Sequence, residues 1–81
     1  MLKINYDRTN DIMYFSLGDK SNSYGDEIVD GFVVMRDIET DEITGFTIFD
    51  FIKKYESNNL YSLPLPIPID FDADVIAKIC N

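Results

Sequence analysis

The stretches Ile12-Met-Tyr-Phe-Ser-Leu17, Phe32-Val-Val-Met-Arg-Asp37 and Ile43-Thr-Gly-Phe-Thr-Ile-Phe49 decide the fold of this chain. Each is rich in β-branched and aromatic residues, and each is bounded by polar residues typical of turns. In the first stretch the alternation puts Met13 and Phe15 on one face and Ile12 and Tyr14 on the other. Neither face is fully polar, so we expect both faces of the sheet to need cover.

Two weaker strands are expected beside these three. Residues 2–6 alternate as a half-buried strand and form a hairpin with residues 12–17 through the polar loop 7–11. Residues 24–29 carry two acids, which is typical of an edge strand that avoids pairing with another chain. The turn that follows, Asp30-Gly31, favours type I′ because Gly31 readily takes positive φ. Gly45 is a candidate for a bulge or a close approach of two backbones.

The remainder of the chain predicts two short helices joined by a strap. Asp50 is placed to cap a helix over residues 51–56. Residues 60–69 contain three prolines at alternate positions, which favours extended backbone. Asp72 is placed to cap a C-terminal helix whose apolar residues form one stripe. The members of that stripe are Val75, Ile76, Ile79 and Cys80.

The sequence therefore predicts an α+β fold in one domain, residues 1–81. A meander-like antiparallel sheet of four to five strands and the first helix occupy residues 1–56. The proline strap and the C-terminal helix occupy residues 57–81. A chain of 81 residues buries only about 60% of the surface that it exposes when unfolded, so association with a second copy would add stability.

Charge and cysteine content exclude several classes of protein. The net charge of −8 disfavours direct binding to nucleic acid or to an anionic membrane surface, since both require lysine and arginine. Cys80 is the single cysteine, so an intramolecular disulfide cannot form. The sequence contains no signal peptide and no apolar segment of membrane-spanning length, and we expect a cytoplasmic protein.

No catalytic, cofactor-binding or metal-binding residues are assigned from the sequence. The chain has no histidine to activate a serine or Cys80, and its glycines are too scattered for a phosphate-binding loop. Asp70, Asp72 and Asp74 have the spacing that begins an EF-hand loop, but Val75 and Asn81 stand where the glycine and the bidentate glutamate are required. We expect these three acids to mark a helix N-terminus.

A second acidic group falls on the connection before the last strand. It consists of Asp37, Glu39, Asp41 and Glu42. Solvated loop acids are the simplest interpretation, and a cation site or a contact for a basic partner is the functional alternative.

Residues 2–55 resemble the small prokaryotic family known as domain of unknown function 2283. The resemblance rests on Ile4-Asn-Tyr-Asp7, on Asp11-Ile-Met-Tyr-Phe-Ser-Leu17, on residues 27–34 and on Ile43-Thr-Gly-Phe-Thr-Ile-Phe-Asp50. It implies a compact β-rich module with a short helix and supplies no catalytic group. The tail, residues 60–81, departs from the family pattern, so a particular role could have been added there.

Two functions from different classes follow. The first is a non-enzymatic protein-binding or self-assembling module, expected as a homodimer because apolar residues occupy both strand faces. The alternative is an acidic inhibitor, antitoxin or nucleic-acid mimic that binds a basic protein. A weaker hypothesis, a carboxylate-based hydrolase or metal site, requires a pocket that gathers at least two acids.

Overall fold

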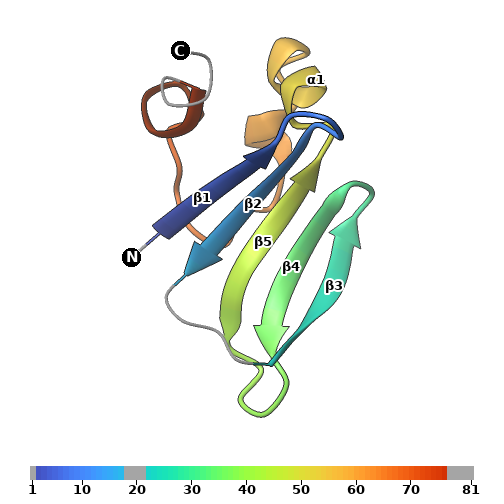
Figure 1. Cartoon of the computed structure of the whole chain (residues 1–81), viewed down its shortest axis with the longest axis vertical. Helices are drawn as coiled ribbons and strands as arrows, with labels where there is room; N and C mark the ends of the chain where they lie inside the picture. Colours follow the sequence, from blue (N-terminus) through green and yellow to red (C-terminus); the bar gives the residue numbers. More distant parts are fainter. Residues whose placement is uncertain (1, 18–21, 77–81) are drawn as a thin grey trace.

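The computed structural model describes residues 2–17 and 22–76. Its elements are β1 (Leu2–Asp7), β2 (Ile12–Leu17), β3 (Ser23–Val29), β4 (Phe32–Asp37), β5 (Ile43–Phe49), α1 (Phe51–Glu56), a 3₁₀ turn η1 (Leu60–Ser62) and a π-helical turn η2 (Asp72–Ile76). The five strands form one antiparallel sheet, followed by the short helix α1 (Figure 1). This confirms the expected α+β class, with five strands.

The strand order is β1-β2-β5-β4-β3, so the expected meander is wrong. The last strand, β5, lies between β2 and β4 and pairs with both, and β2 and β3 are not neighbours. Burial explains this order, because Gly45 to Ile48 of β5 are all buried. β3 carries Asp26 and Glu27, has a register shift after Glu27, and is left at the edge.

Gly45 allows β5 to approach β2 closely. A Cβ atom at this position would lie 2.3 Å from the backbone oxygen of Phe15, well inside van der Waals contact. The neighbouring pair β4–β5 has a register shift after Met35, which is paired with Gly45. The expectation of a close approach at Gly45 is confirmed.

The turn between β3 and β4 differs from the expected type. Gly31 has a φ of +80°, as its lack of a Cβ allows, whereas Asp30 has no positive φ. A type I′ turn needs positive φ at both central residues, so this turn is of another type. Val29 pairs with Phe32 across a shifted register. The irregular end of β3 can therefore be joined to β4 without a type I′ turn.

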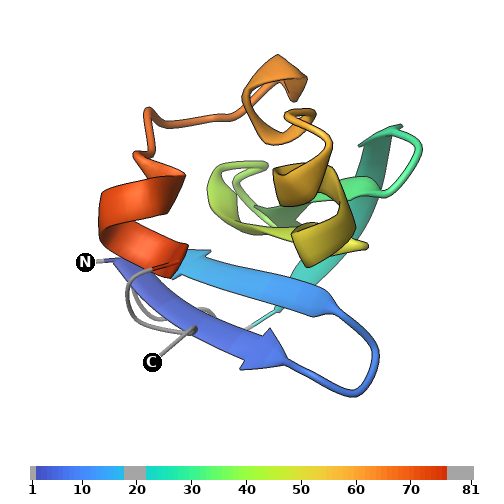
Figure 2. The same cartoon turned by 90° about the horizontal axis from the view of Figure 1, so that it is seen from above.

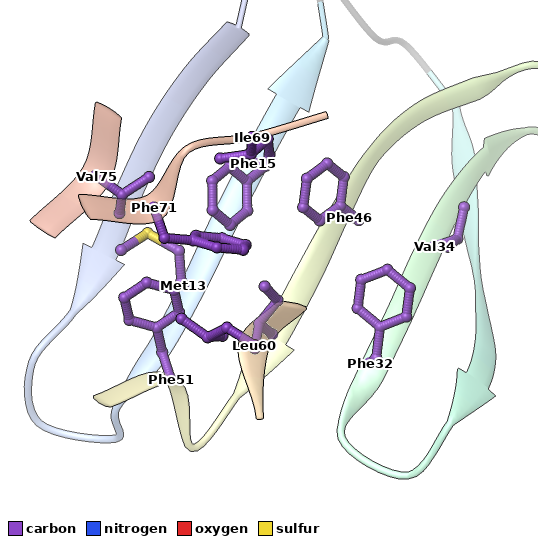
Figure 3. Close-up of a cluster of buried hydrophobic side chains, with 11 residues drawn as sticks. Met13, Phe15, Phe32, Val34, Phe46, Phe51, Leu60, Ile69, Phe71 and Val75 are labelled. Carbon is purple, nitrogen blue, oxygen red and sulfur yellow. The ribbon is translucent and has the colours of Figure 1, made fainter. Parts of the chain in front are cut away.

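One face of the sheet and the tail together form the core. Figure 2 shows α1, η1 and η2 on the same side of β1 and β2. Phe71 reaches from the tail toward the sheet (Figure 3), where its ring lies 6.2 Å from that of Phe15 and 5.9 Å from that of Phe51. The buried residues are Met13, Phe15, Phe32, Val34, Phe46, Ile48, Phe51, Leu60, Ile69, Phe71 and Val75. The tail thus supplies the cover for one face only.

The N-terminus of α1 is capped by a residue from a distant hairpin. Asp50 stands at the N-cap position, but it has a left-handed φ of 53° and its side chain caps nothing. The carboxylate of Asp11 instead accepts hydrogen bonds from the backbone N–H of Ile52 at 2.9 and 3.1 Å and of Lys53 at 3.4 Å. The expected cap by Asp50 is wrong because its left-handed backbone does not direct the carboxylate toward the helix.

The segment after α1 is irregular apart from its two short turns. The proline-containing stretch between η1 and η2 has no regular structure, and Ile69 at its end is buried. At η2, the Asp70 carboxylate accepts the Ala73 N–H at 3.1 Å, so Asp70 takes the role expected of Asp72. Val75 is buried in the core. Ile79 and Cys80 lie outside the described residues.

Candidate functional site

The face of the sheet opposite the tail is the first candidate site, and we call it the open face. Strand alternation directs its side chains away from the core, and α1, η1 and η2 all lie on the other side (Figure 2). Tyr14 and Phe49 remain 40% and 42% exposed there, whereas Thr47 between its neighbours is only 8% exposed. The centre of the open face consists of Ile12, Tyr14, Val33, Met35, Thr47 and Phe49.

The open face is organised in rows that run across the strands. One row joins Asn5, Tyr14, Thr47, Val33 and Glu27 from β1 to β3. A large aromatic side chain therefore lies on one side of the central threonine and a smaller valine on the other.

The next row is shallower because it contains two glycines. It joins Lys3, Ser16, Gly45, Met35 and Gly25, again from β1 to β3. The two rows place a lysine near one edge of the open face and Glu27 near the other. The apolar centre thus has polar edges, with Lys3 and Asp7 on β1 and Glu27 on β3.

A cavity at the end of α1 is the second candidate site. It has a volume of about 260 Å³ and is lined by Tyr55, Glu56, Asn58, Leu60, Tyr61 and Asp72. The hydroxyl of Tyr55 donates to Oδ1 of Asp72 at 2.5 Å, which links α1 to η2. The hydroxyl oxygen of Tyr61 accepts the Phe71 N–H at 2.8 Å. Two phenol rings and two carboxylates therefore surround one small space, and none of its described lining residues is basic.

The acids that resemble an EF-hand loop are engaged separately. The Asp70 carboxylate caps the turn η2 and the Asp72 carboxylate accepts the Tyr55 hydroxyl. The contact of Asp74 is through its backbone N–H, which donates to the Asp70 carbonyl at 2.8 Å. Within residues 2–17 and 22–76, no three acidic or cysteine side chains converge as metal ligands would. Asp72 and Glu56 line the same cavity, and nothing in the sequence predicts that these two acids lie near each other.

The acids before β5 order their own loop. The Asp37 carboxylate accepts the N–H groups of Thr40 and Glu39 at 3.0 and 2.8 Å, and these bonds hold its pKa below the ordinary value. Asp41, with a φ of 64°, accepts a short hydrogen bond from the Tyr24 hydroxyl, which raises the pKa of that tyrosine. These contacts explain two of the four acids without a ligand.

The hairpin β1–β2 repeats this arrangement. The Asp7 carboxylate accepts the N–H groups of Thr9 and Asn10, and its pKa is lowered mainly by the hydrogen bond from the Asn10 side chain. Asp11, with a φ of 54°, accepts the Tyr6 hydroxyl at 2.6 Å. The acids that carry the family resemblance in this hairpin therefore have structural partners.

Comparisons with known proteins identify a family for this chain. Within the described part of the chain, no helix has the length and apolar character needed to cross a membrane. No curated protein and no solved structure matches the chain. The family model described as protein of unknown function (DUF2283) matches residues 3–51, from β1 to the start of α1. The chain therefore belongs to the DUF2283 family of proteins of unknown function.

Proposed function

We propose that this chain is a non-enzymatic self-assembling module and that its open face packs against the open face of a second copy. The observation that carries the proposal is the one-sided cover of the sheet. The tail packs on one face, while Tyr14 and Phe49, on the inner strands β2 and β5, stay exposed on the other. Exposed apolar groups on a strand surface that has polar edges are typical of a protein interface.

A two-fold axis parallel to the strands and passing over β5 gives a complementary fit. Such an axis places β2 of one copy over β4 of the other, as in the aligned packing of two sheets. The ring of Tyr14 then lies over the smaller Val33 of the second copy. Met35 lies over Ser16, and the two Phe49 rings meet near the axis. Tyr14 and Met35 thus lie opposite smaller side chains, and the two Phe49 rings pack on each other.

The edges of the open face meet in this arrangement. The axis places β1 of one copy over β3 of the other, so Glu27 faces Asn5 of the second copy, with Lys3 one row to one side and Asp7 one row to the other. The footprint is roughly 24 by 20 Å at ordinary strand spacings. That is smaller than a standard interface of about 800 Å² per partner, and we expect a micromolar dissociation constant.

The test is the oligomeric state of matched variants, measured by sedimentation and light scattering. Tyr14→Lys places a charge in the centre of the open face and is expected to weaken the dimer at least tenfold. Ile38→Lys adds the same charge at a residue that is 62% exposed on the β4–β5 loop, and is expected to leave the dimer unchanged. A wild-type chain that is monomeric at micromolar concentration would contradict the proposal.

A charge exchange tests the orientation of the axis. Lys3→Glu leaves Glu27 of the second copy between two acids and should weaken the dimer, and the added change Glu27→Lys should restore the wild-type affinity. Failure of the double variant to recover, with both variants folded, would exclude the parallel axis.

The second candidate is an acidic inhibitor or nucleic-acid mimic that binds a basic protein. The net charge of −8 and the two carboxylates at the cavity beside α1 favour it. Affinity purification at low and high salt separates the candidates, since exposed charge contacts are screened beyond about 10 Å at 0.1 M salt. Loss of a captured basic partner at high salt supports this candidate, whereas apolar self-association persists.

A further inference from the structure

The cavity beside the C-terminal end of α1 combines aromatic and acidic side chains, of which Tyr55, Tyr61 and Asp72 also make hydrogen bonds that hold the tail. Its floor is Leu60, which is buried in the core, and its walls include the rings of Tyr55 and Tyr61. Glu56 and Asp72 supply two carboxylates. Tyr61 is 57% exposed although it lies against Phe71, with ring centroids 5.2 Å apart. An aromatic ring held in place at a surface is a preformed contact for a ligand.

The negative charge at this cavity is not neutralised by its described surroundings. Asp72 uses Oδ1 for the Tyr55 hydroxyl, and no described donor occupies Oδ2. The Glu56 carboxylate makes no hydrogen bond or ion pair with the described residues. The neighbouring Lys54 is turned to the opposite end of the helix, where its Nζ donates to the Phe49 carbonyl at 2.5 Å. Among residues 2–17 and 22–76, no cationic side chain is paired with either carboxylate.

We propose that this cavity binds a guanidinium group, as carried by an arginine side chain of a partner protein or by a small cationic molecule. A guanidinium ion is planar, donates several hydrogen bonds to carboxylates and stacks on aromatic rings. The cavity offers these partners together, two phenol rings beside Glu56 and Asp72. At about 260 Å³ it is smaller than most sites for drug-sized ligands, which suits a single side-chain head group.

The proposal does not depend on association through the open face. The cavity is lined by residues from α1, η1, η2 and the turn after α1. Figure 2 shows these three elements on the covered side of the sheet. A dimer formed through the open faces would leave it accessible, and a monomer would retain it. Failure of one proposal therefore leaves the other intact.

The test is a titration of the full chain at constant ionic strength, monitored by two-dimensional NMR of its backbone amides. The probes are methylguanidinium, the blocked tripeptide Gly-Arg-Gly, and the same tripeptide with citrulline, which has the shape of arginine without its charge. We expect saturable shifts at Asn58, Tyr61 and Phe71 with the two cationic probes and none with the citrulline peptide. Tighter binding of the arginine peptide identifies a protein side chain as the source of the group, and equal binding identifies a small cation.

Matched variants separate this site from the overall negative charge. The double variant Glu56→Gln/Asp72→Asn should weaken binding of the arginine peptide at least tenfold. Glu39→Gln/Glu42→Gln removes the same charge from the β4–β5 loop and should leave binding unchanged. Thermal unfolding of both variants checks that the fold persists. Equal binding of the citrulline peptide, equal losses in both double variants, or shifts confined to the β4–β5 loop would overturn the proposal.

Discussion

The carboxylate of Asp11 accepts the backbone N–H of Ile52 across 41 residues of sequence, at 2.9 Å. The Phe51 N–H also donates to the Asp11 carbonyl oxygen at 3.0 Å, and the Tyr6 hydroxyl donates to the same carboxylate. The first hairpin therefore supplies the N-terminal cap of α1. This contact fixes the helix to the end of the sheet where β1 meets β2.

Removal of the Asp11 carboxylate should destabilise the fold. Asp11→Ala leaves the N–H groups of Ile52 and Lys53 and the Tyr6 hydroxyl without their acceptor, and we expect a loss of about 1–3 kcal/mol in the free energy of unfolding. Asp50→Asn keeps a residue that tolerates the left-handed backbone, and its side chain caps nothing, so a change within about 0.5 kcal/mol is expected. Chemical denaturation measures both. A larger loss at Asp50 than at Asp11 would contradict this assignment of the cap.

The Asp11 contact also shows where prediction from the sequence ends. The alternation in residues 12–17, 32–37 and 43–49 predicts strands, because side-chain direction along a strand depends on local sequence only. The pairing of β2 with β5 is a contact between distant segments, and nothing in either segment specifies it. The apolarity of both sheet faces was evident in the sequence, but which face the tail covers was not. Asp11 caps α1 in place of Asp50 because Asp50 has a left-handed φ of 53°. The sequence does not reveal that backbone angle.

The cavity was beyond prediction for a similar reason. Tyr55 and Tyr61 belong to segments whose positions depend on how the tail returns to the sheet. Asp72 meets them only after the proline-containing stretch has crossed between η1 and η2. In the sequence Asp72 stands between Asp70 and Asp74 and is naturally grouped with them. In the folded chain its carboxylate instead accepts the hydroxyl of Tyr55.

The glycine at position 45 should be intolerant of any side chain. Gly45→Ala places a Cβ atom 2.3 Å from the Phe15 backbone oxygen, which belongs to the central pair β2–β5 and cannot rotate away. We expect a loss of about 2–4 kcal/mol in stability.

Gly25→Ala is the matched control for Gly45→Ala. The nearest atom to its added Cβ is the Val33 Cγ1 at 3.0 Å, and a side chain on the edge pair β3–β4 can adjust. Its loss should be at least 1 kcal/mol smaller than that of Gly45→Ala. Thermal and denaturant unfolding give the comparison. Equal losses would mean that the β2–β5 contact is no tighter than the sheet edge.

Acid should weaken the fold partly through the two hairpin loops. The hydrogen bonds to Asp7 and Asp37 lower the pKa of each carboxyl group in the folded chain below the ordinary value of 3.8. A lowered folded-state pKa contributes stability that is complete above the unfolded-state value and is lost as the pH falls through the folded-state value. The double variant Asp7→Asn/Asp37→Asn should therefore show a flatter decline of Tm below about pH 4 than the wild-type chain. A parallel decline in both proteins would show that other carboxylates dominate.

Alkali should act on the Tyr24 hydroxyl in the opposite sense. Its hydrogen bond to Asp41 raises its pKa above the ordinary value of 10.0, so the contribution to stability is complete below the unfolded-state value and is lost as the pH rises through the folded-state value. Ultraviolet absorbance of the phenolate, compared between the wild-type chain and Asp41→Asn, should show one tyrosine that titrates at lower pH in the variant. Identical titration curves would exclude a contribution from Asp41.

The tail should be part of the folded domain although the family match ends at residue 51. Phe71 is fully buried against Phe15 and Phe51, and Phe71→Ala removes the ring that joins the tail to the sheet. We expect a loss of about 3–5 kcal/mol, close to the whole stability of a small domain, because the cavity left behind adds to the lost burial. Ile38→Ala, at an exposed residue of the β4–β5 loop, should change stability by less than about 0.5 kcal/mol. Circular dichroism and denaturant unfolding of both variants provide the measurement. If Phe71→Ala unfolded like Ile38→Ala, the sheet would be stable without its tail, and the covered face would need a different explanation.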